Sequence, residues 1–286
     1  MPLFRPPSEG RSLIIQATLG CSHNKCSFCA MYRTKTFSIR AFDDIQRDVE
    51  EAARRVPHAT RVFLADGDAL VIPTKRLLPI LELLQEKFPH LERITSYAMP
   101  RNLLKKSTAE LRQLRDAGLN MLYYGVETGD PLLLERITKG ATREDMIEGC
   151  AKAKEADMML STTCILGLGG KKYSQQHIEG TASLLSAIEP EFASALTLTV
   201  VPEVASEFYE KYGEPFEELS VEQVLEETAL LIRGMDVTST EFRSNHASNH
   251  LPLKGVLNRD REALLAMLHR GKEDPSLWRP EWMRGL

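Results

Sequence analysis

The sequence predicts an α/β protein: a partial or near-complete (β/α)6-7 TIM-like barrel with a short C-terminal extension. Short apolar segments alternate with amphipathic helical segments along most of the 286 residues, and the links between them are short. Such alternation indicates parallel strands joined by right-handed crossovers. Acidic, polar and glycine-rich segments follow several of the strands. A barrel carries its functional site at these carboxyl ends, so we expect the site there.

The first half of the chain alternates most regularly. A strand is expected at 12–18, and the helix expected at 42–56 has Asp43 and Asp44 in its first turn, where the helix dipole favours acids. The strand expected at 61–65 stops at a turn of Asp and Gly residues. The remaining elements of this half are a helix at 74–88, a strand at 93–98, a helix capped by Ser107 that stops at Gly118, and a strand at 121–126.

The second half continues the pattern and suggests one domain. Its expected elements are helices at 131–137 and 143–154, a strand at 158–166, a helix at 174–188, a strand at 193–201, a helix at 221–233, a seventh strand at 237–242 and a helix at 260–268. We therefore expect a barrel at residues 1–240. Residues 241–286 are expected as an extension that packs on the barrel and is not an independent domain.

Composition excludes several classes of protein. The hydrophobic fraction is 43% and the charged fraction 27%, and no apolar run is long enough to span a bilayer. The N-terminal residues lack the apolar segment of a signal peptide, so we expect a cytoplasmic protein without a membrane partner. The net charge of −4 gives no general electrostatic reason to bind nucleic acid. Five unevenly spaced cysteines do not resemble a disulfide framework.

The chain is organised around a cysteine loop at residues 19–33. Cys21, Cys26 and Cys29 lie within nine residues of one another, directly after the first expected strand. Thiolates at this density bind a soft metal or an iron–sulfur cluster. A structural zinc site needs four ligands, and only His23 is a nearby fourth. Three cysteines on a four-iron cluster would instead leave one iron open to a small molecule; zinc and redox-thiol sites remain the alternatives.

The spacing Cys-x4-Cys-x2-Cys, with Phe28 before the last cysteine, resembles the cluster loop of the radical S-adenosylmethionine (radical SAM) superfamily. The commonest form of that loop is Cys-x3-Cys-x2-Cys, so this chain carries one extra residue, which the segment 22–25 must absorb. The resemblance implies that Cys21, Cys26 and Cys29 bind a [4Fe-4S] cluster. It also implies that Phe28 lies against the bound S-adenosylmethionine.

A second motif follows the next strand. Asp66-Gly67-Asp68 resembles the Gly-Gly-Glu-like motif that meets the methionine amino group of the cofactor in this superfamily, although Asp66 replaces the first glycine. The resemblance implies cofactor contacts from Gly67 and Asp68, since a carboxylate and exposed backbone carbonyls suit an ammonium group. The alternative is an ordinary strand-to-helix turn, in which Asp and Gly are the commonest residues.

A third motif, Gly125-Val126-Glu127-Thr128-Gly129, ends the fourth strand. It resembles a segment of the elongator and oxygen-independent coproporphyrinogen-oxidase branch of the superfamily. The resemblance implies that Glu127 contacts the ribose or the methionine end of the cofactor, and a carboxylate can accept two hydroxyl hydrogen bonds. Lys139 follows at a position that, by the same resemblance, reaches the methionine carboxylate. The alternatives are a solvated strand-end charge for Glu127 and a helix-ending residue for Lys139.

Two more strand ends carry candidate residues. Ser96 ends the third strand, where the resemblance implies a polar cofactor contact, and Tyr97 beside it is a candidate for substrate binding or for packing. The glycine-rich segment 167–170 resembles the part of the same branch where backbone approaches adenine, which implies a contact from Gly167. Glycine permits such an approach because it has no Cβ.

A polar segment at 242–253 follows the last expected strand. If that strand closes the barrel, Asn245, His246 and Asn249 would line the open mouth and bind substrate. The alternatives are a capped loop rich in turn-forming residues and a second metal site through His246 and His250.

The resemblance implies a reductive reaction. A reduced [4Fe-4S] cluster cleaves S-adenosylmethionine to methionine and a 5′-deoxyadenosyl radical, which abstracts hydrogen from a substrate, and a one-electron donor such as flavodoxin or ferredoxin is needed. We expect a small-molecule substrate, because no RNA-binding appendage is evident and Cys150 and Cys164 are too few for an auxiliary cluster. The alternatives are an RNA-modifying radical SAM enzyme and a zinc- or thiol-dependent binding or regulatory protein.

Overall fold

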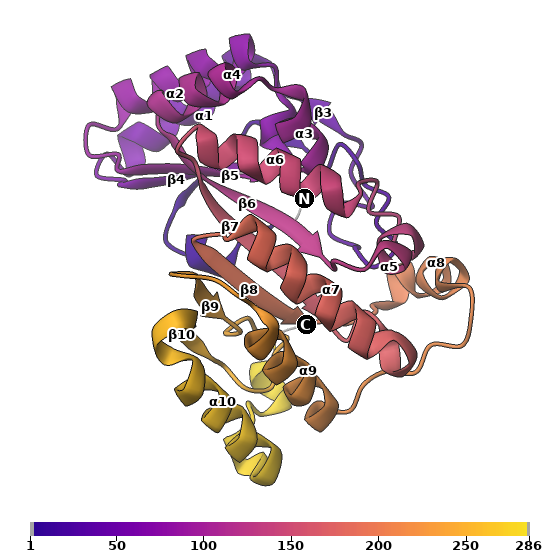
Figure 1. The fold of residues 1–286 in the computed structure, drawn as a ribbon. Coiled ribbons are helices and arrows are strands. Elements are labelled where there is room, and N and C mark those ends of the chain that lie inside the picture. Colours follow the sequence, from indigo (N-terminus) through magenta and orange to yellow (C-terminus); the bar gives the residue numbers. More distant parts are fainter. Residues whose placement is uncertain (1–2, 285–286) are drawn as a thin grey trace. The chain divides into compact units, whose positions relative to one another are not determined.

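The structure is a computed structural model that describes residues 3–284 (Figure 1). The chain divides into two compact units. Unit 1 comprises Met1–Asn24, Met31–Tyr124 and Glu148–Leu160, and unit 2 comprises Lys25–Ala30, Gly125–Ile147 and Ser161–Leu286. The cysteine loop contributes residues to both units, and so do two of the strands.

Eight strands form a mostly parallel sheet in the order β1-β4-β5-β6-β7-β8-β9-β10. The expected α/β class with a partial barrel is thereby confirmed, and the sheet is open, with β1 and β10 as its edge strands. The strands are β1 (Leu13–Gln16), β4 (Arg61–Ala65), β5 (Arg93–Ala98), β6 (Leu119–Glu127), β7 (Met159–Leu166), β8 (Phe192–Thr197), β9 (Glu241–Arg243) and β10 (Lys254–Val256), and a separate antiparallel pair is formed by β2 (Thr18–Leu19) and β3 (Ser38–Ile39).

In unit 1, β1, β4, β5 and β6 pair in parallel. Residues 62–65 of β4 are all buried, because helices cover a parallel sheet on its faces and leave no polar side to the strand. The helix α4 begins with the expected capping box, in which Ser107 and Glu110 each satisfy the backbone of the other. The helices of this unit are α1 (Phe42–Arg55), α2 (Thr74–Lys87), α3 (Pro100–Lys105) and α4 (Thr108–Asp116), and α6 (Arg143–Glu155) crosses into it.

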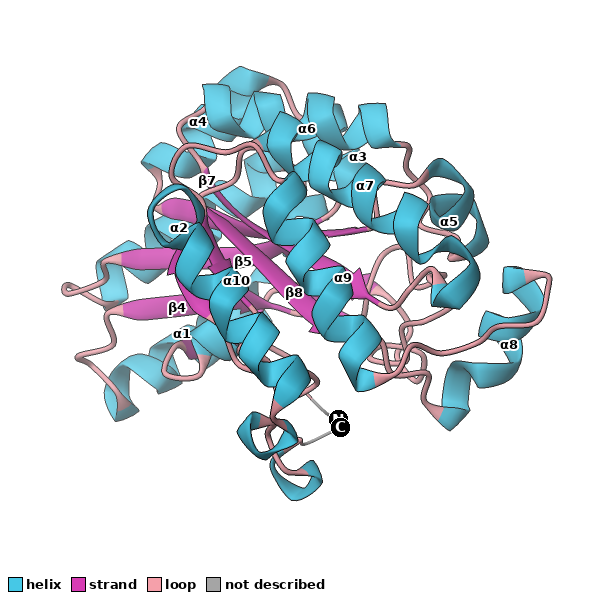
Figure 2. Ribbon diagram, turned by 60° about the horizontal axis from the view of Figure 1, so that its bottom comes forward, coloured by secondary structure: helices cyan, strands magenta, loops and turns pink. Residues whose placement is uncertain are grey.

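In unit 2, β7, β8 and β9 pair in parallel and β10 pairs antiparallel with β9. Figure 2 shows α7, α9 and α10 side by side, and α9 packs against both of the others. A capping box at Ser220 and Gln223 begins α9. The helices of this unit are α5 (Pro131–Arg136), α7 (Gly170–Ile188), α8 (Pro202–Tyr212), α9 (Val221–Gly234) and α10 (Leu257–Glu273).

Several elements differ from the sequence-based expectation. The strand expected at 193–201 ends at Thr197, and a helix that was not expected, α8, follows at Pro202. Its signals are present in the sequence: a proline at the first helical position and Gly213 after the end, in the left-handed conformation. The seventh strand, expected at 237–242, is β9 at Glu241–Arg243. The pair β2/β3, the strand β10 and the six-residue helix α3 went unpredicted, because elements this short carry little periodicity. No helix among residues 3–284 is long and apolar enough to cross a membrane.

Candidate functional site

Both ends of the cysteine loop are held in unit 1 by one carboxylate. The backbone N–H of Gly20, directly before Cys21, donates to Oδ2 of Asp66 at 2.9 Å. Nζ of Lys35, beyond the last cysteine, donates to the same oxygen at 2.8 Å. The Asp66 side chain is 0% exposed and that of Lys35 is 2% exposed, so this ion pair is shielded from solvent. Strand β4 thus presents the carboxylate that fastens the loop.

The predicted cofactor glycine, Gly67, lies against an aromatic ring. A Cβ at this position would overlap the ring of Tyr32, which explains why the position requires glycine. The N–H of Gly67 donates to the carbonyl of Gly20 at 3.1 Å. Gly67 therefore supports the start of the cysteine loop, and its contact with the cofactor stays a prediction.

Asp68 is fully buried, and protein groups in unit 1 occupy both of its carboxylate oxygens. One oxygen accepts from the hydroxyl of Ser22 and the other from the side-chain amide of Asn102 on α3. Nη2 of Arg101 lies 4.0 Å from the same carboxylate. Burial raises the pKa of Asp68, and these hydrogen bonds oppose that shift. Asp68 joins the residue after Cys21 to α3, so a further role at the methionine amino group remains a prediction.

The loop turns back at Asn24. Asn24 has φ +47°, in the left-handed region, which asparagine adopts more readily than most residues. Its side-chain amide donates to the carbonyl of Tyr32 at 2.9 Å. This turn lies inside the segment 22–25, where the sequence requires one extra residue to be absorbed.

The middle of the loop, residues 25–30, belongs to unit 2. The N–H of Ser27 donates to the carbonyl of Ile137 at 2.9 Å, at the end of α5. Phe28 packs against an apolar cluster of this unit that includes Leu133 and Ile137. The structure therefore gives Phe28 a packing role, while its predicted contact with the cofactor stays untested.

Glu127 ends β6 and forms an ion pair. Nζ of Lys139 lies 2.8 Å from Oε1 of Glu127. Glu127 has φ +61°, a conformation that strains a residue with a long side chain and is concentrated at functional sites. A Cβ on Gly125 would overlap the Glu127 carboxylate, so the first glycine of the motif makes room for the pair.

The rest of this motif joins β6 to α7. A Cβ on Gly129 would overlap the carbonyl of Gly180, so the last glycine allows the helix to approach closely. His177 on α7 has Nε2 2.9 Å from the carbonyl of Ile165 and Nδ1 2.8 Å from the Thr128 hydroxyl. Because a carbonyl only accepts, Nε2 carries the hydrogen and Nδ1 accepts from Thr128. Burial lowers the pKa of His177 to about 4, so the ring stays neutral at physiological pH.

Gly167 is held by a buried carboxylate that sequence analysis missed. Gly167 follows β7 with φ +79°, and its N–H donates to Oε2 of Glu227 at 2.5 Å. The Ser174 hydroxyl donates to the other oxygen at 2.8 Å. Burial raises the pKa of Glu227 to about 7. A signal existed, because Glu227 lies three residues after Val224 and four before Leu231, on the apolar stripe of α9.

Ser96 and Tyr97 end β5 in different surroundings. Oγ of Ser96 is buried, and no hydrogen-bond partner for it exists among residues 3–284. A buried hydroxyl without a partner is costly, which fits the predicted cofactor contact. The ring of Tyr97 packs edge-on against Phe63 at 5.1 Å and against Tyr123 at 6.2 Å between centroids. Tyr97 thus has a structural role, and its substrate contact remains a prediction.

The three substrate candidates near the C-terminus share one loop of unit 2. Asn249 is 3% exposed; its amide donates to the carbonyl of Ala195 at 2.8 Å, and its oxygen accepts from Thr197 at 2.9 Å. The carbonyl of His246 accepts from Nη1 of Arg279 at 2.6 Å, whereas Asn245 is exposed. Asn249 fastens the loop to the end of β8, which explains its burial without a substrate.

The cysteines fall into two groups. Cys21, Cys26 and Cys29 are half-buried, and no disulfide forms within the described part of the chain. Burial raises the pKa of Cys150 to about 12 and also raises that of Cys164, so both thiols remain protonated and unreactive. Three partly accessible thiols on a short loop suit a thiolate-bound cluster. No group of three His, Cys, Asp or Glu side chains is arranged as a metal site within residues 3–284, so these ligand roles remain predictions.

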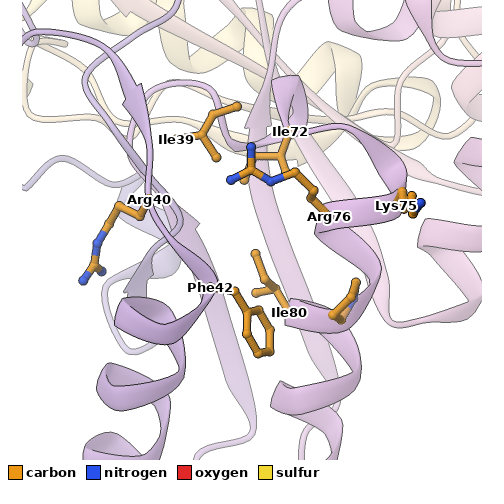
Figure 3. A pocket seen from close by; sticks show the side chains of 8 residues that line it. Ile39, Arg40, Phe42, Ile72, Lys75, Arg76 and Ile80 are labelled. Carbon is orange, nitrogen blue, oxygen red and sulfur yellow. The ribbon is translucent and has the colours of Figure 1, made fainter.

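A groove of about 250 Å³ opens on unit 1 (Figure 3), and none of the predicted site residues lines it. Its walls include Ile39 of β3, and β3 pairs with β2, which ends two residues before Cys21. Nη1 of Arg40 is held by the carbonyl of Gln16 at 2.9 Å. The groove is lined by Ile39, Arg40, Phe42, Ile72, Lys75, Arg76, Pro79 and Ile80. The lining therefore combines three basic side chains with apolar ones, and Arg40 among them is paired with Asp48 at 2.5 Å.

Comparison with known proteins assigns a family. Residues 15–185, more than half of the chain, match the family model described as Radical SAM superfamily. A heme chaperone, HemW of Bacillus subtilis (strain 168), is 23% identical over 147 residues, which cover 51% of this chain and 38% of that protein. This chain therefore aligns with well under half of the length of that curated relative.

Solved structures agree in fold. Coproporphyrinogen III oxidase (HemN) from Escherichia coli matches with a TM-score of 0.58 and 18% identity, over 78% of this chain and 52% of that one. Methylornithine synthase (PylB) matches with a TM-score of 0.55 and 15% identity, over 90% of this chain and 68% of that one. The relatives include the coproporphyrinogen-oxidase branch that the motifs resemble. The family match, supported by this fold, shows that the chain belongs to the radical SAM superfamily, whose enzymes use a [4Fe-4S] cluster and S-adenosylmethionine.

Proposed function

We propose that Cys21, Cys26 and Cys29 hold a [4Fe-4S] cluster and that the chain uses it to start a radical reaction on a small molecule. The observation that carries the proposal is the three-cysteine spacing within the region that matches the family. When bound, the cluster supplies the electron that cleaves S-adenosylmethionine to methionine and a 5′-deoxyadenosyl radical.

The chain's own residues bind and orient the cofactor. Glu127 accepts hydrogen bonds from the ribose hydroxyls, and the contact with Lys139 positions the Glu127 carboxylate. The Ser96 hydroxyl, which has no partner among the described residues, binds a polar atom of the cofactor. Gly67 and Gly167 let the backbone approach it closely, and Asp68 stays near the methionine amino group. Phe28 contacts the cofactor.

The substrate is a small molecule that Tyr97, Asn245, His246 and Asn249 help to position. Methylornithine synthase and coproporphyrinogen III oxidase, whose folds are similar, have names that denote small molecules, which supports this class. Cys150 and Cys164 are buried thiols with raised pKa values, which makes them unsuited to a thiol-based function.

Anaerobic reconstitution tests the cluster. The wild-type protein should take up about four iron and four sulfide and absorb broadly near ~400 nm. Cys21→Ala, Cys26→Ala and Cys29→Ala should each lose most of this absorbance, while Cys150→Ala, a matched loss of a thiol, should keep it. After dithionite reduction, wild type with S-adenosylmethionine should form 5′-deoxyadenosine. Tight binding of one zinc ion without a cluster would favour the zinc alternative and reject the proposal.

The reaction also needs a one-electron donor, and we place its docking face at the basic groove. Lys75 and Arg76 are exposed in the first turn of α2, where no acidic residue opposes them, and neither has an ion-pair partner among the described residues. The groove strand β3 pairs with Thr18, three residues before Cys21, which by chain length is at most about 10 Å away. An acidic donor such as flavodoxin or ferredoxin would fit this docking face.

Charge reversal tests the docking face. Lys75→Glu with Arg76→Glu should weaken flavodoxin binding to the reconstituted enzyme by about tenfold or more and flatten its salt dependence. The matched control is Arg54→Glu with Arg55→Glu, at the exposed end of α1, which makes the same change in net charge. Equal weakening by both pairs would mean that only overall charge matters and would refute this docking face.

A further inference from the structure

The strongest observation that the proposed function leaves unused is the ion pair between Asp66 and Lys35. One carboxylate oxygen accepts the N–H of Gly20 at 2.9 Å and Nζ of Lys35 at 2.8 Å. Gly20 and Lys35 lie on either side of the three cysteines, 46 and 31 residues from Asp66 in sequence. A single group on β4 thus closes the base of the whole loop.

This chain differs from the superfamily pattern both at Asp66 and in the length of the cysteine loop that Asp66 contacts. The Gly-Gly-Glu-like motif has glycine where this chain has Asp66, and glycine offers no carboxylate. The loop also carries an extra residue within 22–25, turned at Asn24 with φ +47°. A longer loop loses more conformational entropy when its ends are brought together. An attachment that holds both ends therefore has a larger entropy cost to offset.

We propose that Asp66 and Lys35 form a clasp that holds the lengthened cysteine loop closed and so positions the cluster ligands. This inference rests on the proposed cluster for its second readout only. Asp66 acts through Gly20 and Lys35 and is a positioning residue. The other carboxylate oxygen, Oδ1, has no partner among residues 3–284, so the attachment depends on Oδ2 alone.

The attraction between Asp66 and Lys35 is strong because both side chains are shielded from solvent. The side chains of Asp66 and Lys35 are 0% and 2% exposed, so solvent does not screen their attraction. Removing the Asp66 charge takes this carboxylate away from a buried ammonium, which is more damaging than removing both charges together. This asymmetry distinguishes an electrostatic clasp from simple packing.

The first readout is loop opening in the apoprotein. Trypsin cleavage after Lys25 and Arg33 reports opening, because a closed loop resists proteolysis. Asp66→Asn should speed this cleavage by about tenfold or more, and adding Lys35→Met should recover much of the protection. The double variant, which buries no unpaired charge, also covers the case in which the single variant does not fold.

The control is another ion pair of unit 1 with a buried carboxylate. Oε1 of Glu9, whose side chain is 0% exposed, lies 2.9 Å from Nη2 of Arg93, whose side chain is 24% exposed. Glu9→Gln should leave cleavage after Lys25 within about twofold of wild type, because that pair does not touch the loop. Equal acceleration by Glu9→Gln and Asp66→Asn would overturn the clasp, since any destabilisation would then open the loop.

The second readout is cluster retention. In reconstituted protein, Asp66→Asn should release iron to a chelator about tenfold faster than wild type and change the electron paramagnetic resonance signal, whereas Glu9→Gln should do neither. A wild-type cluster with unchanged release in Asp66→Asn would reject the clasp while the proposed function stands. If wild type takes up no cluster, the proposed function fails, and the trypsin result alone decides the clasp.

Discussion

Two ion pairs between a carboxylate and a lysine lie at the carboxyl ends of strands, and they differ in their surroundings. Asp66, directly after β4, pairs with Lys35, and Glu127, at the end of β6, pairs with Lys139. In each pair the lysine Nζ lies 2.8 Å from a carboxylate oxygen. The first pair is 0% and 2% exposed, and its carboxylate also accepts a backbone N–H. In the second pair, the Glu127 side chain is 11% exposed and the Lys139 side chain is 6% exposed. The Glu127 carboxylate occupies the space next to Gly125, and Glu127 itself has φ +61°.

The two pairs differ in role: one stabilises the folded chain, and the other is suited to binding a ligand. The Asp66 carboxylate is enclosed by the loop that it fastens, so it contributes to stability. The Glu127 carboxylate keeps some access to solvent and is held in a strained backbone conformation that packing alone does not require. We therefore expect changes at Asp66 to act on folding and changes at Glu127 to act on cofactor binding.

The largest change in stability is expected for the pair of Asp66 and Lys35. Asp66→Asn should lower the free energy of unfolding at pH 7 by about 3–5 kcal/mol, because the buried Lys35 ammonium loses its contact with the Asp66 carboxylate. Urea denaturation of the apoprotein measures this loss. A change below about 1 kcal/mol, the range of surface ion pairs, would remove the distinction drawn between the two pairs.

Glu227 is a buried carboxylate that does not pair with a lysine, and its effect on stability should depend on pH. The pKa of Glu227 is raised to about 7, so between about pH 4.5 and 7 the unfolded chain releases a proton that the folded chain keeps. Stability from this group is present below pH 4.5 and is lost as pH rises to 7, by up to about 3 kcal/mol.

Glu227→Gln removes this dependence. The unfolding free energy of the variant relative to wild type should rise between pH 4.5 and pH 8, measured by urea denaturation at each pH. His177 titrates in the opposite sense but is common to both proteins and cancels in the difference. A difference that stays constant over this range would contradict the raised pKa of Glu227.

The pair of Glu127 and Lys139 should respond in binding more than in stability. Glu127→Gln should lower the unfolding free energy by less than Asp66→Asn does, because the Glu127 side chain is 11% exposed and that of Asp66 is 0% exposed. Affinity for S-adenosylmethionine, measured by calorimetry on reconstituted protein, should fall by about tenfold. A large loss of stability with unchanged affinity would reverse the roles of the two pairs.

The smallest effect on stability is expected at Gly125. Gly125→Ala places a Cβ against the flexible end of Glu127, so the carboxylate must swing away from Lys139 while the strand persists. Stability should change by less than about 1 kcal/mol, and affinity for S-adenosylmethionine should fall several-fold. Gly255→Ala, in β10 of the same unit, places a Cβ against Asp260 and Leu264 and is the control for a crowded glycine replacement away from Glu127. An affinity equal to wild type would separate Glu127 from the cofactor.

The sequence by itself determined the α/β class, most of the strands and helices, and the positions of the chemistry-bearing segments at strand ends. These features are local: apolar periodicity, caps such as Ser107 and turns such as Asp66-Gly67-Asp68 act within a few residues. The cysteine spacing is local too, and it carried the family resemblance. Strands of two or three residues were missed because so short a strand has no period to read, and the helices α3 and α8 were missed as well.

Only the tertiary structure decided which side chains these segments meet. Lys35 reaches Asp66 across 31 residues and Glu227 reaches Gly167 across 60, and nothing within either segment identifies its partner. The same reason separates the two acids of one turn: Asp66 fastens the loop, while Ser22 and Asn102 occupy Asp68. Composition can place a carboxylate at a strand end, but its charge, burial and role depend on groups that folding brings from far along the chain.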